Sequence, residues 1–152
     1  MRILVTGGAG YIGSHTLVSL LSKEHEICVV DNYANSSPIA LDRVRRLTNH
    51  DFEQHELDIG DGPILSAVFA EFQPEVVIHF AGLKAVGASE RDPLLYYNEN
   101  VGGAISLLRA MDASNCRQIV FSSSATVYGE PHYLPYDEKH PLAPINPYGR
   151  TK

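Results

Sequence analysis

The sequence predicts an α/β protein, a doubly wound parallel sheet with helices on both of its faces. Short apolar runs rich in β-branched residues alternate along the chain with longer stretches of helical periodicity, which is the pattern of strands buried in a parallel sheet. A glycine-rich turn follows the first apolar run, and an aspartate ends the second. With 152 residues, 44% of them hydrophobic, the chain is about one domain long and can bury a sizeable core.

The first element is a strand, residues 2–5, that runs directly into a turn with four glycines: Gly7, Gly8, Gly10 and Gly13. Two spacings typical of dinucleotide-binding turns are present, G-x-G-x-x-G from Gly8 and G-x-x-G-x-x-G from Gly7. In such a turn, backbone amides and the positive end of a helix dipole face a pyrophosphate, and the missing Cβ atoms let it approach. The alternative is that the glycines serve only close packing of helix on strand. The helix that follows has one apolar side, formed by Ile12, Leu17, Leu20 and Leu21.

The second strand, residues 27–30, ends in Asp31. A carboxylate about 20 residues beyond the glycines is placed to accept hydrogen bonds from the ribose hydroxyls of adenosine. The next four residues are Asn32, Tyr33, Ala34 and Asn35. None of them is an arginine or lysine that would neutralise a 2′-phosphate, so the sequence predicts that the cofactor is NAD and not NADP.

The third strand and the helices beside it carry the next candidates. Ser37 is the expected N-cap of a helix that begins at Pro38. A weak strand, residues 52–57, leads to Asp58 and Ile59, which in a doubly wound sheet lie beside the adenine. We expect Asp58 to accept a hydrogen bond from the adenine amino group and Ile59 to pack on the ring, unless Asp58 caps the helix that follows. The apolar faces expected for the two helices are Leu41, Val44 and Leu47, and Ile64, Leu65, Val68, Phe69 and Phe72.

The fourth strand, residues 76–78, is the clearest central strand, and it ends in Phe80-Ala81-Gly82. Small residues at the carboxyl end of a strand let a ligand lie across the sheet edge. We interpret His79 as a packed strand residue. Lys84 is a candidate contact to phosphate or ribose, or else a solvated loop lysine. Asp92-Pro93 then starts a long helix with two glycines in its middle. The glycine pair destabilises the helix by roughly 1–2 kcal/mol relative to alanine. This cost predicts that the glycines allow close packing against another backbone or leave room for a cofactor.

The fifth strand, residues 118–121, runs into a hydroxyl-rich segment, residues 122–126. Hydroxyls at this edge can bond a sugar or a carbonyl, or they form an ordinary polar turn. After a proline-rich loop, Asn146-Pro147 starts a helix that carries Tyr148 and Lys152, an i,i+4 pair on one helical face. An ammonium and a positive nicotinamide nearby would stabilise a phenolate, so the tyrosine can serve as a base.

Composition excludes several classes of function. A formal charge of −6 without any lysine or arginine cluster argues against nucleic-acid and anionic-membrane partners, and no apolar run is long enough to span a membrane. The seven histidines form no H-x-x-x-H motif and no cluster in sequence with the two cysteines, so no metal site is predicted. We expect a cytoplasmic protein, because the first strand starts too early for a signal peptide and the cysteines lack a spacing motif.

Six segments together resemble the extended short-chain dehydrogenase/reductase family: TGGAGYIG, Asp31-Asn32, Asp58-Ile59, HFAGLKAVGAS, FSSSATVYG and NPYGRTK. The resemblance covers all 152 residues and implies a Rossmann-type fold. The glycine turn and the Tyr-x-x-x-Lys motif mark the superfamily, whereas FAGLKAVGAS and SSSATVYG are similar to its nucleotide-sugar epimerases. The resemblance therefore implies interconversion of UDP-glucose and UDP-galactose, in galactose metabolism, by transient oxidation at sugar C4 with tightly bound NAD.

The resemblance also implies a role for each site residue. Tyr148 would remove the proton from the sugar 4-OH, Lys152 would hold the nicotinamide ribose, and Ser124, assisted by Thr126, would bond the 4-oxygen. The pyrophosphate would be held by Gly7, Gly10, Tyr11, Ile12 and Gly13, and the adenosine by Asp31, Asn32, Asn35, Ser36, Asp58 and Ile59. The middle of the cofactor would lie on Phe80, Ala81, Gly82, Leu83 and Lys84, and Asn100 matches an asparagine of the family. Lys84, Ser124, Thr126 and Tyr148 would also contact the UDP-sugar substrate. Glu99 is less typical of the family, which argues against a direct contact there.

Members of the family are much longer, and their second half supplies the last strands and a smaller substrate domain. We therefore expect residues 1–152 to be an incomplete NAD-binding domain without turnover of its own. The intact protein is expected to be a homodimer, with the helix from Pro93 to Ser114 supplying one face. The alternatives are an NAD-binding module without turnover and another NAD-dependent nucleotide-sugar enzyme, a 4,6-dehydratase or a decarboxylase. Dehydratases usually carry an Asp-Glu pair where this chain has Ala125-Thr126.

Overall fold

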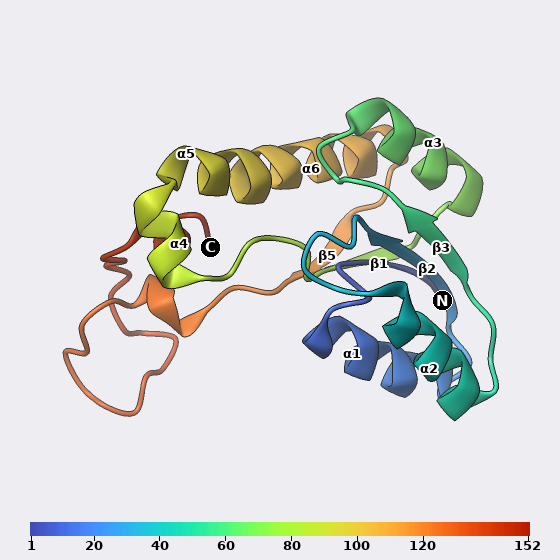
Figure 1. Ribbon diagram of the computed structural model, residues 1–152, viewed down its shortest axis with the longest axis horizontal. Coiled ribbons are helices and arrows are strands. Elements are labelled where there is room, and N and C mark those ends of the chain that lie inside the picture. Colours follow the sequence, from blue (N-terminus) through green and yellow to red (C-terminus); the bar gives the residue numbers. More distant parts are fainter.

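The computed structural model describes all 152 residues, and its centre is a five-stranded parallel sheet (Figure 1). The strands are β1 Arg2–Thr6, β2 Glu26–Asp31, β3 Glu53–Glu56, β4 Val76–His79 and β5 Gln118–Phe121. They lie in the order β3-β2-β1-β4-β5, so the direction of winding reverses at β1. This reversal confirms the doubly wound sheet, because right-handed crossovers in the two directions place helices on opposite faces.

The two helical layers are separate in the structure (Figure 1). The helices are α1 Tyr11–Leu21, α2 Pro38–Thr48, α3 Gly62–Phe72, α4 Val86–Arg91, α5 Pro93–Tyr96, α6 Gly103–Ala113 and α7 Pro147–Arg150. Alternate strand residues face the two layers: Leu4 and Cys28 belong to the core beneath α3 and α6, whereas Val5 and Val29 belong to the core beneath α1 and α2. The molecule therefore has two hydrophobic cores, one on each face of the sheet.

Four helices begin at side-chain caps that the sequence carries. The Ser37 hydroxyl accepts a hydrogen bond from the Ile39 amide, as expected. The caps of α3, α5 and α7 are Asp61, Asp92 and Asn146. Each cap satisfies a backbone N–H group that has no partner within the helix. Asp61 is therefore the cap of α3, and the alternative that gave this role to Asp58 is wrong.

Three apolar residues expected on buried helix faces are exposed in the structure. Ile12, Leu47 and Ile64 have exposed fractions of 50%, 77% and 53%. Ile12 and Ile64 each precede the first buried residue of their helix by one position, which rotates the side chain by about 100° from the buried face. Leu47 lies six residues beyond the buried Leu41, about 120° from it around the helix axis. The remaining members of these faces are buried or half-buried.

The long helix predicted after Asp92 is continuous but not uniformly α-helical. A π-helical turn, Tyr97–Gly102, joins α5 to α6. The glycine at the start of α6 lies against a side chain, since a Cβ atom on Gly103 would be 2.9 Å from the end of Ile59. Gly103 therefore allows close packing, although against a side chain and not a backbone, whereas a Cβ atom on Gly102 would make only ordinary contacts. The short helix α4, which precedes this segment, was not anticipated.

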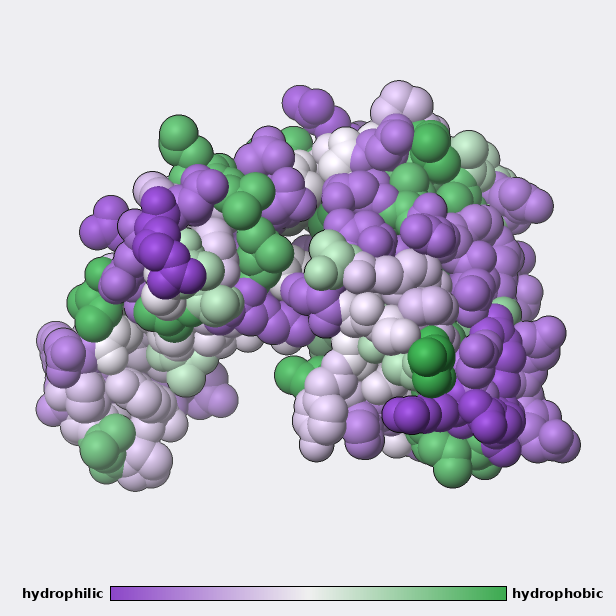
Figure 2. Space-filling model, viewed as in Figure 1, coloured by the Kyte–Doolittle hydropathy of each residue, from purple (hydrophilic) through white to green (hydrophobic).

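The C-terminal part of the chain is less covered than the rest. All four residues of β5 are exposed, while β2 is buried from Ile27 to Asp31. In the loop of residues 129–145, the rings of Tyr133 and Tyr136 pack around the buried His140, together with the ring of Tyr128 just before the loop. Figure 2 shows the surface hollowed between the lobe with this loop and the lobe with α1 and α2. None of the helices combines the length and the apolar composition needed to cross a lipid bilayer.

Candidate functional site

A cleft opens at the carboxyl end of the sheet, where the winding reverses. Thr6 pairs with Val30 on one side and His79 on the other, so the segments after β1, β2 and β4 meet at this edge. The cleft is lined by Gly7, Gly10, Val30, Asp31, Asn32, Ala34, Asn35, Leu57, Asp58, Ile59, Phe80, Ala81, Gly82, Leu83, Lys84 and Glu99. Most of the cofactor residues expected from the sequence are in this set.

The glycine turn is shaped by close backbone contacts. Gly7 has φ +70°, and a Cβ atom there would lie 2.6 Å from the amide nitrogen of Ala81. A Cβ atom on Gly13 would lie 2.3 Å from the carbonyl oxygen of Gly7. Gly8 instead packs against Val29 on β2. The G-x-x-G-x-x-G spacing from Gly7 therefore describes the turn, and Gly8 has the packing role that the alternative gave to all of the glycines.

The first turn of α1 presents free amides beside this turn. The Gly10 amide donates to the carbonyl of Gly7, and the Ser14 amide is the first to donate within the helix, to the carbonyl of Gly10. The intervening amides of residues 11–13 thus lack the partners that a longer helix would supply. Tyr11 and Ile12, whose side chains are exposed, do not line the cleft. Only their backbone can serve an anion there.

Asp31 holds the glycine turn and the end of β2 together. Its Oδ2 accepts a hydrogen bond from the Ala9 amide at 2.9 Å, and its Oδ1 accepts from the Tyr33 amide and the Ser36 hydroxyl. A carboxylate offers about four lone-pair directions, so these three bonds leave one for a ligand. Ser36, expected to contact adenosine, does not line the cleft and instead orients Asp31.

Asp58 is held in a similar way at the end of β3. Its Oδ2 accepts from the Asn32 side-chain amide at 2.8 Å, and its Oδ1 accepts from the Gly60 amide at 2.7 Å. Two lone pairs remain for another donor. Ile59 is buried and lines the cleft beside it.

The segment after β4 is fixed from behind by a buried asparagine. The side chain of Asn100 accepts a hydrogen bond from the Leu83 amide at 2.7 Å and donates to the Leu83 carbonyl at 3.0 Å. It also donates to the Thr151 hydroxyl at 2.9 Å. Asn100 does not line the cleft, so it is a positioning residue that joins the cleft wall to the segment after α7.

Lys152 lies beside the cleft, next to the lining residue Gly82. A Cβ atom on Gly82, whose φ is +137°, would lie 3.5 Å from the Nζ atom of Lys152. This Nζ atom donates to the carbonyl of Ser122 at 3.2 Å. Burial, together with the charge of Lys84, lowers the pKa of Lys152. The two cations therefore repel each other at this end of the cleft, and an anion between them would relieve the repulsion.

The tyrosine and serine of the predicted catalytic set lie outside the cleft lining. Tyr148 is buried in α7, where its amide donates to the Ser89 hydroxyl at 3.1 Å. Helix α7 ends at Arg150, so Lys152 lies just beyond the helix and not within it. The Ser124 hydroxyl accepts hydrogen bonds from the amide and the hydroxyl of Thr126.

His79 is a packed residue, as expected. It is 2% exposed, and its Nδ1 atom shares a 2.6 Å hydrogen bond with the Thr6 hydroxyl. Burial first, and then the charge of Lys152, lower the pKa of His79 to about 4. The imidazole is therefore neutral at neutral pH, and it supports the strand end behind the cleft.

Sequence reasoning missed several contributors. Val30, Ala34 and Leu57 also line the cleft. Val30 and Leu57 directly precede Asp31 and Asp58, and Ala34 follows Asp31 by three residues. This closeness in sequence to the two aspartates was the available signal. Glu99 also lines the cleft, although its departure from the family pattern argues against a direct contact. The roles of Ser89 and Thr151 had no signal in the sequence, because each depends on a contact more than fifty residues away.

The comparisons with known proteins give one family model and several similar enzymes. A family model described as GDP-mannose 4,6 dehydratase matches residues 4–152. The UDP-glucose 4-epimerase of Bacillus subtilis is 55% identical over 152 residues, which are 100% of this chain and 45% of that protein. UDP-glucose 4-epimerase 2 of Arabidopsis thaliana is 52% identical over 99% of this chain and 44% of its own length.

A solved structure agrees with these two relatives. The UDP-glucose 4-epimerase of Bifidobacterium longum, crystallised in complex with NAD+ and UDP, superposes with a TM-score of 0.98 at 47% identity. The match covers 100% of this chain and 46% of that one. The chain thus spans less than half the length of these relatives.

Proposed function

This chain belongs to the family described as GDP-mannose 4,6 dehydratase, and we propose that it is the NAD-binding part of a UDP-glucose 4-epimerase. The observation that carries the proposal is one cleft that is lined by Asp31, Asp58, the glycine turn and Gly82, with the Nζ atom of Lys152 next to Gly82. The relatives that match the whole chain are enzymes of this activity. The reaction would interconvert UDP-glucose and UDP-galactose.

The groups in the cleft fit NAD. Asp31 and Asp58 keep free lone pairs for ribose and adenine donors, and no basic residue lies between Asp31 and Ser36 to hold a 2′-phosphate. The free amides of residues 11–13 fit the pyrophosphate, helped by the N-terminal dipole of α1. Ile59 and Leu57 offer apolar surface to the adenine, and segment 80–84 would take the middle of the cofactor. NAD would supply reversible oxidation at sugar C4.

Tyr148, Lys152 and Ser124 would carry the proton chemistry of the reaction. In the proposal, the phenolate oxygen of Tyr148 takes the proton of the sugar 4-OH during oxidation and returns it after the keto sugar has turned over. The Lys152 ammonium stabilises the tyrosinate by its charge and holds the nicotinamide ribose. The hydroxyls of Ser124 and Thr126 hold the 4-oxygen, and Lys84 contacts phosphate.

A 4,6-dehydratase is the second candidate, because the matching family model carries that description. Elimination of water needs an acid and a base beside the sugar C5 and C6. At the corresponding segment the chain has Ala125 and Thr126, and the Thr126 hydroxyl donates to Ser124. The absence of carboxylates at these two positions favours the epimerase.

We further propose that residues 1–152 are an incomplete NAD-binding domain, since the sheet strand β5 is exposed, and that the intact protein has a separate substrate domain. The partners would be a UDP-sugar and a second copy of the protein. Leu94, Leu95, Ile105 and Leu108 leave apolar surface on the long helix, which suits a homodimer. Two buried free thiols suit a reducing cytoplasm.

The test is a coupled assay on UDP-galactose with three proteins: this chain, a form extended to the length of the relatives, and the extended form with Tyr148→Phe. We expect turnover only in the unmutated extended form, with Tyr148→Phe lowering kcat by on the order of 10²- to 10⁴-fold. Tyr97→Phe, a change at an exposed tyrosine, is the matched control. An extended form that binds NAD but leaves UDP-galactose unchanged would refute the substrate assignment, and a 4-keto-6-deoxy product would identify the dehydratase.

A further inference from the structure

The edge strand β3 differs in composition from every other strand of the sheet. Its sequence is Glu-Gln-His-Glu, and Glu53 and His55 are half-buried while Gln54 and Glu56 are exposed. Glu53 pairs with Cys28, and His55 pairs with Val30. Since paired residues of parallel strands point to the same face, a carboxylate and an imidazole lie on the face that elsewhere holds the apolar core beneath α3.

These two side chains and a thiol form a compact group. The Sγ atom of Cys28, a carboxylate oxygen of Glu53 and an imidazole nitrogen of His55 all lie within 4.8 Å of one another. Cys28 is fully buried, whereas the side chains of His55 and Glu53 are 31% and 37% exposed. The thiol therefore lies at the buried end of the group, and the side chains of Glu53 and His55 form a rim that solvent reaches.

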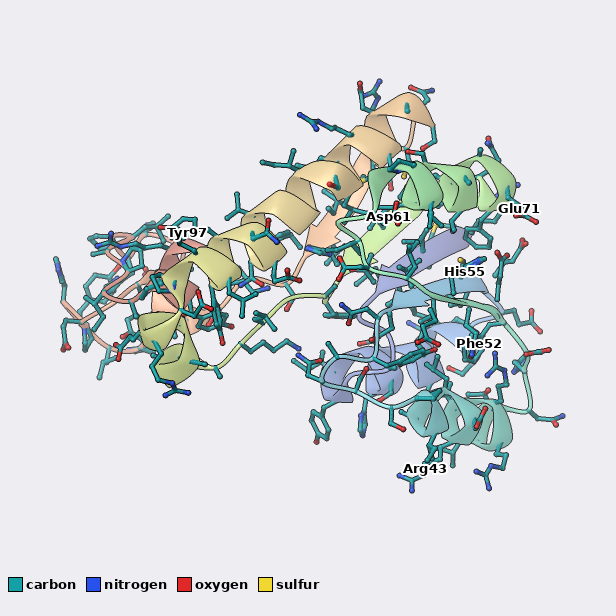
Figure 3. All side chains as sticks on the ribbon, turned by 45° about the horizontal axis from the view of Figure 1, so that its top comes forward. Arg43, Phe52, His55, Asp61, Glu71 and Tyr97 are labelled. Atoms are coloured by element: carbon teal, nitrogen blue, oxygen red, sulfur yellow. The ribbon has the colours of Figure 1, made fainter.

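The charges around the thiol are negative. Burial, then the carboxylate of Glu53, then that of Glu71 raise the pKa of the Cys28 thiol. Figure 3 labels His55 on β3 and Glu71 on α3, the helix over this part of the sheet. Two carboxylates thus act on one thiol, and the Glu53 carboxylate is paired only with the imidazole of His55.

We propose that Cys28, Glu53 and His55 bind one zinc ion at the edge of the sheet. A thiolate, an imidazole and a carboxylate are ligands that zinc takes in tetrahedral sites, where three protein ligands leave one position for water or a further carboxylate. On binding, the metal replaces the thiol proton, which passes to solvent. The hard ions magnesium and calcium, which prefer oxygen ligands, would not compete.

The ion would act as a cross-link between the strands β2 and β3, here called the clip. It would join β2 to β3, which has no strand on its other side and no apolar side chain of its own. Because β3 leads directly to Asp58, the clip would steady the wall of the cleft. A ligand that binds only the folded state raises the free energy of unfolding. At concentrations well above Kd, this increase is proportional to the logarithm of the ratio of ligand concentration to Kd.

The experiment uses the full-length protein without a histidine tag, stripped of metal by a chelator. Zinc is titrated against a chromophoric chelator, and cobalt is used as a probe because a thiolate ligand gives it a charge-transfer absorption. The test variants are Cys28→Val, which keeps an apolar side chain in the core, and His55→Gln at the rim. The controls are Cys116→Ala, at the other free thiol, and His50→Gln, at an exposed histidine.

We expect zinc affinity to fall at least about tenfold in both test variants and to stay unchanged in both controls. Zinc should raise the Tm of the parent and the controls only. The cobalt charge-transfer band should be lost in Cys28→Val. Equal affinity in parent and test variants would overturn the proposal and leave His55 and Glu53 as charges that only protect an edge strand from pairing. His55→Gln keeps the core intact, so this result does not depend on how well Cys28→Val folds.

Discussion

The two halves of the cleft differ in how far the chain completes them. At the ends of β2 and β3, Asp31 and Asp58 are held by hydrogen bonds from neighbouring backbone and side chains, and β2 is buried from Ile27 to Asp31. At the other end, β5 is exposed along its whole length, and Tyr148 and Ser124 do not line the cleft. Both ends are made of the same elements, a parallel strand followed by a polar turn, so the difference lies in what covers them.

This difference separates binding from catalysis. The groups suited to the adenosine and the pyrophosphate are already in place, because each is fixed by contacts within the first hundred residues. The proposed catalytic groups are linked to the cleft mainly through Gly82, Asn100 and Thr151. Substitutions in the region suited to adenosine and pyrophosphate should therefore lower the free energy of unfolding more than similar substitutions in the region of the proposed catalytic groups.

The largest effect is expected at Gly13. Gly13→Ala should lower the free energy of unfolding by about 3 kcal/mol or more, because the new Cβ atom would meet the Gly7 carbonyl oxygen and other backbone atoms. Urea denaturation of both proteins measures this cost. Gly62→Ala is the matched control, since no atom lies within 4 Å of its Cβ position. Equal stability of the two variants would mean that the turn is not packed as described.

His79 lies between the two regions and predicts a dependence on pH. Its pKa is about 4 in the folded chain against 6.5 for the free side chain, so the unfolded state binds the extra proton as the pH falls from 6.5 to 4. Stability should therefore fall over this range, by at most about 3.4 kcal/mol, and be almost unaffected by this group above about pH 7.5. Chemical denaturation at several pH values measures the slope.

Two variants separate the contribution of His79 from that of the other histidines. His79→Gln should remove most of this slope, whereas His50→Gln, at an exposed site, should leave it unchanged. A slope that survives in His79→Gln would assign the effect to a different group.

Asn100 tests the link between the two regions. Asn100→Ala removes hydrogen bonds to both backbone groups of Leu83 and to the Thr151 hydroxyl, which should cost about 2 kcal/mol. NAD affinity, measured by calorimetry, should weaken as well because the cleft wall loses its support. Asn98→Ala, on the exposed side of the same helix, should change stability by less than about 0.5 kcal/mol. Similar losses in both variants would argue against a specific link.

The smallest effect is expected from matched substitutions on the buried strand β2 and the exposed strand β5. Val29→Thr places a hydroxyl in a fully buried site and should cost about 1.5 kcal/mol. Val120→Thr, at a residue that is 56% exposed, should change stability by less than about 0.5 kcal/mol. Denaturation of both variants measures the difference. In a longer form of the protein that covers β5, Val120→Thr should become as costly as Val29→Thr, and an unchanged cost there would mean that β5 stays exposed.

Local patterns predicted the elements well. The glycine turn, the Ser37 cap and all five strands lie where the sequence indicated, because each depends on neighbours within a few residues. The errors follow from the same limit. Ile12, Leu47 and Ile64 have helical periodicity close to that of buried residues, and only the direction of the sheet decides which side of each helix is covered.

The sequence by itself determined the fold class and the residues that could serve a dinucleotide, since alternating strands and helices, turn glycines and strand-end acids are all local signals. Tertiary structure alone decided which of them meet. Asp31 proved to hold the glycine turn, Asn100 to support Leu83 from behind, and Ser89 to hold the Tyr148 backbone. Cys28 and His55 show the same limit, because no spacing in the sequence reveals that neighbouring parallel strands bring them together. The physical reason is that contacts between distant segments depend on sheet register and helix packing, which are set by burial of the whole chain and not by any one segment.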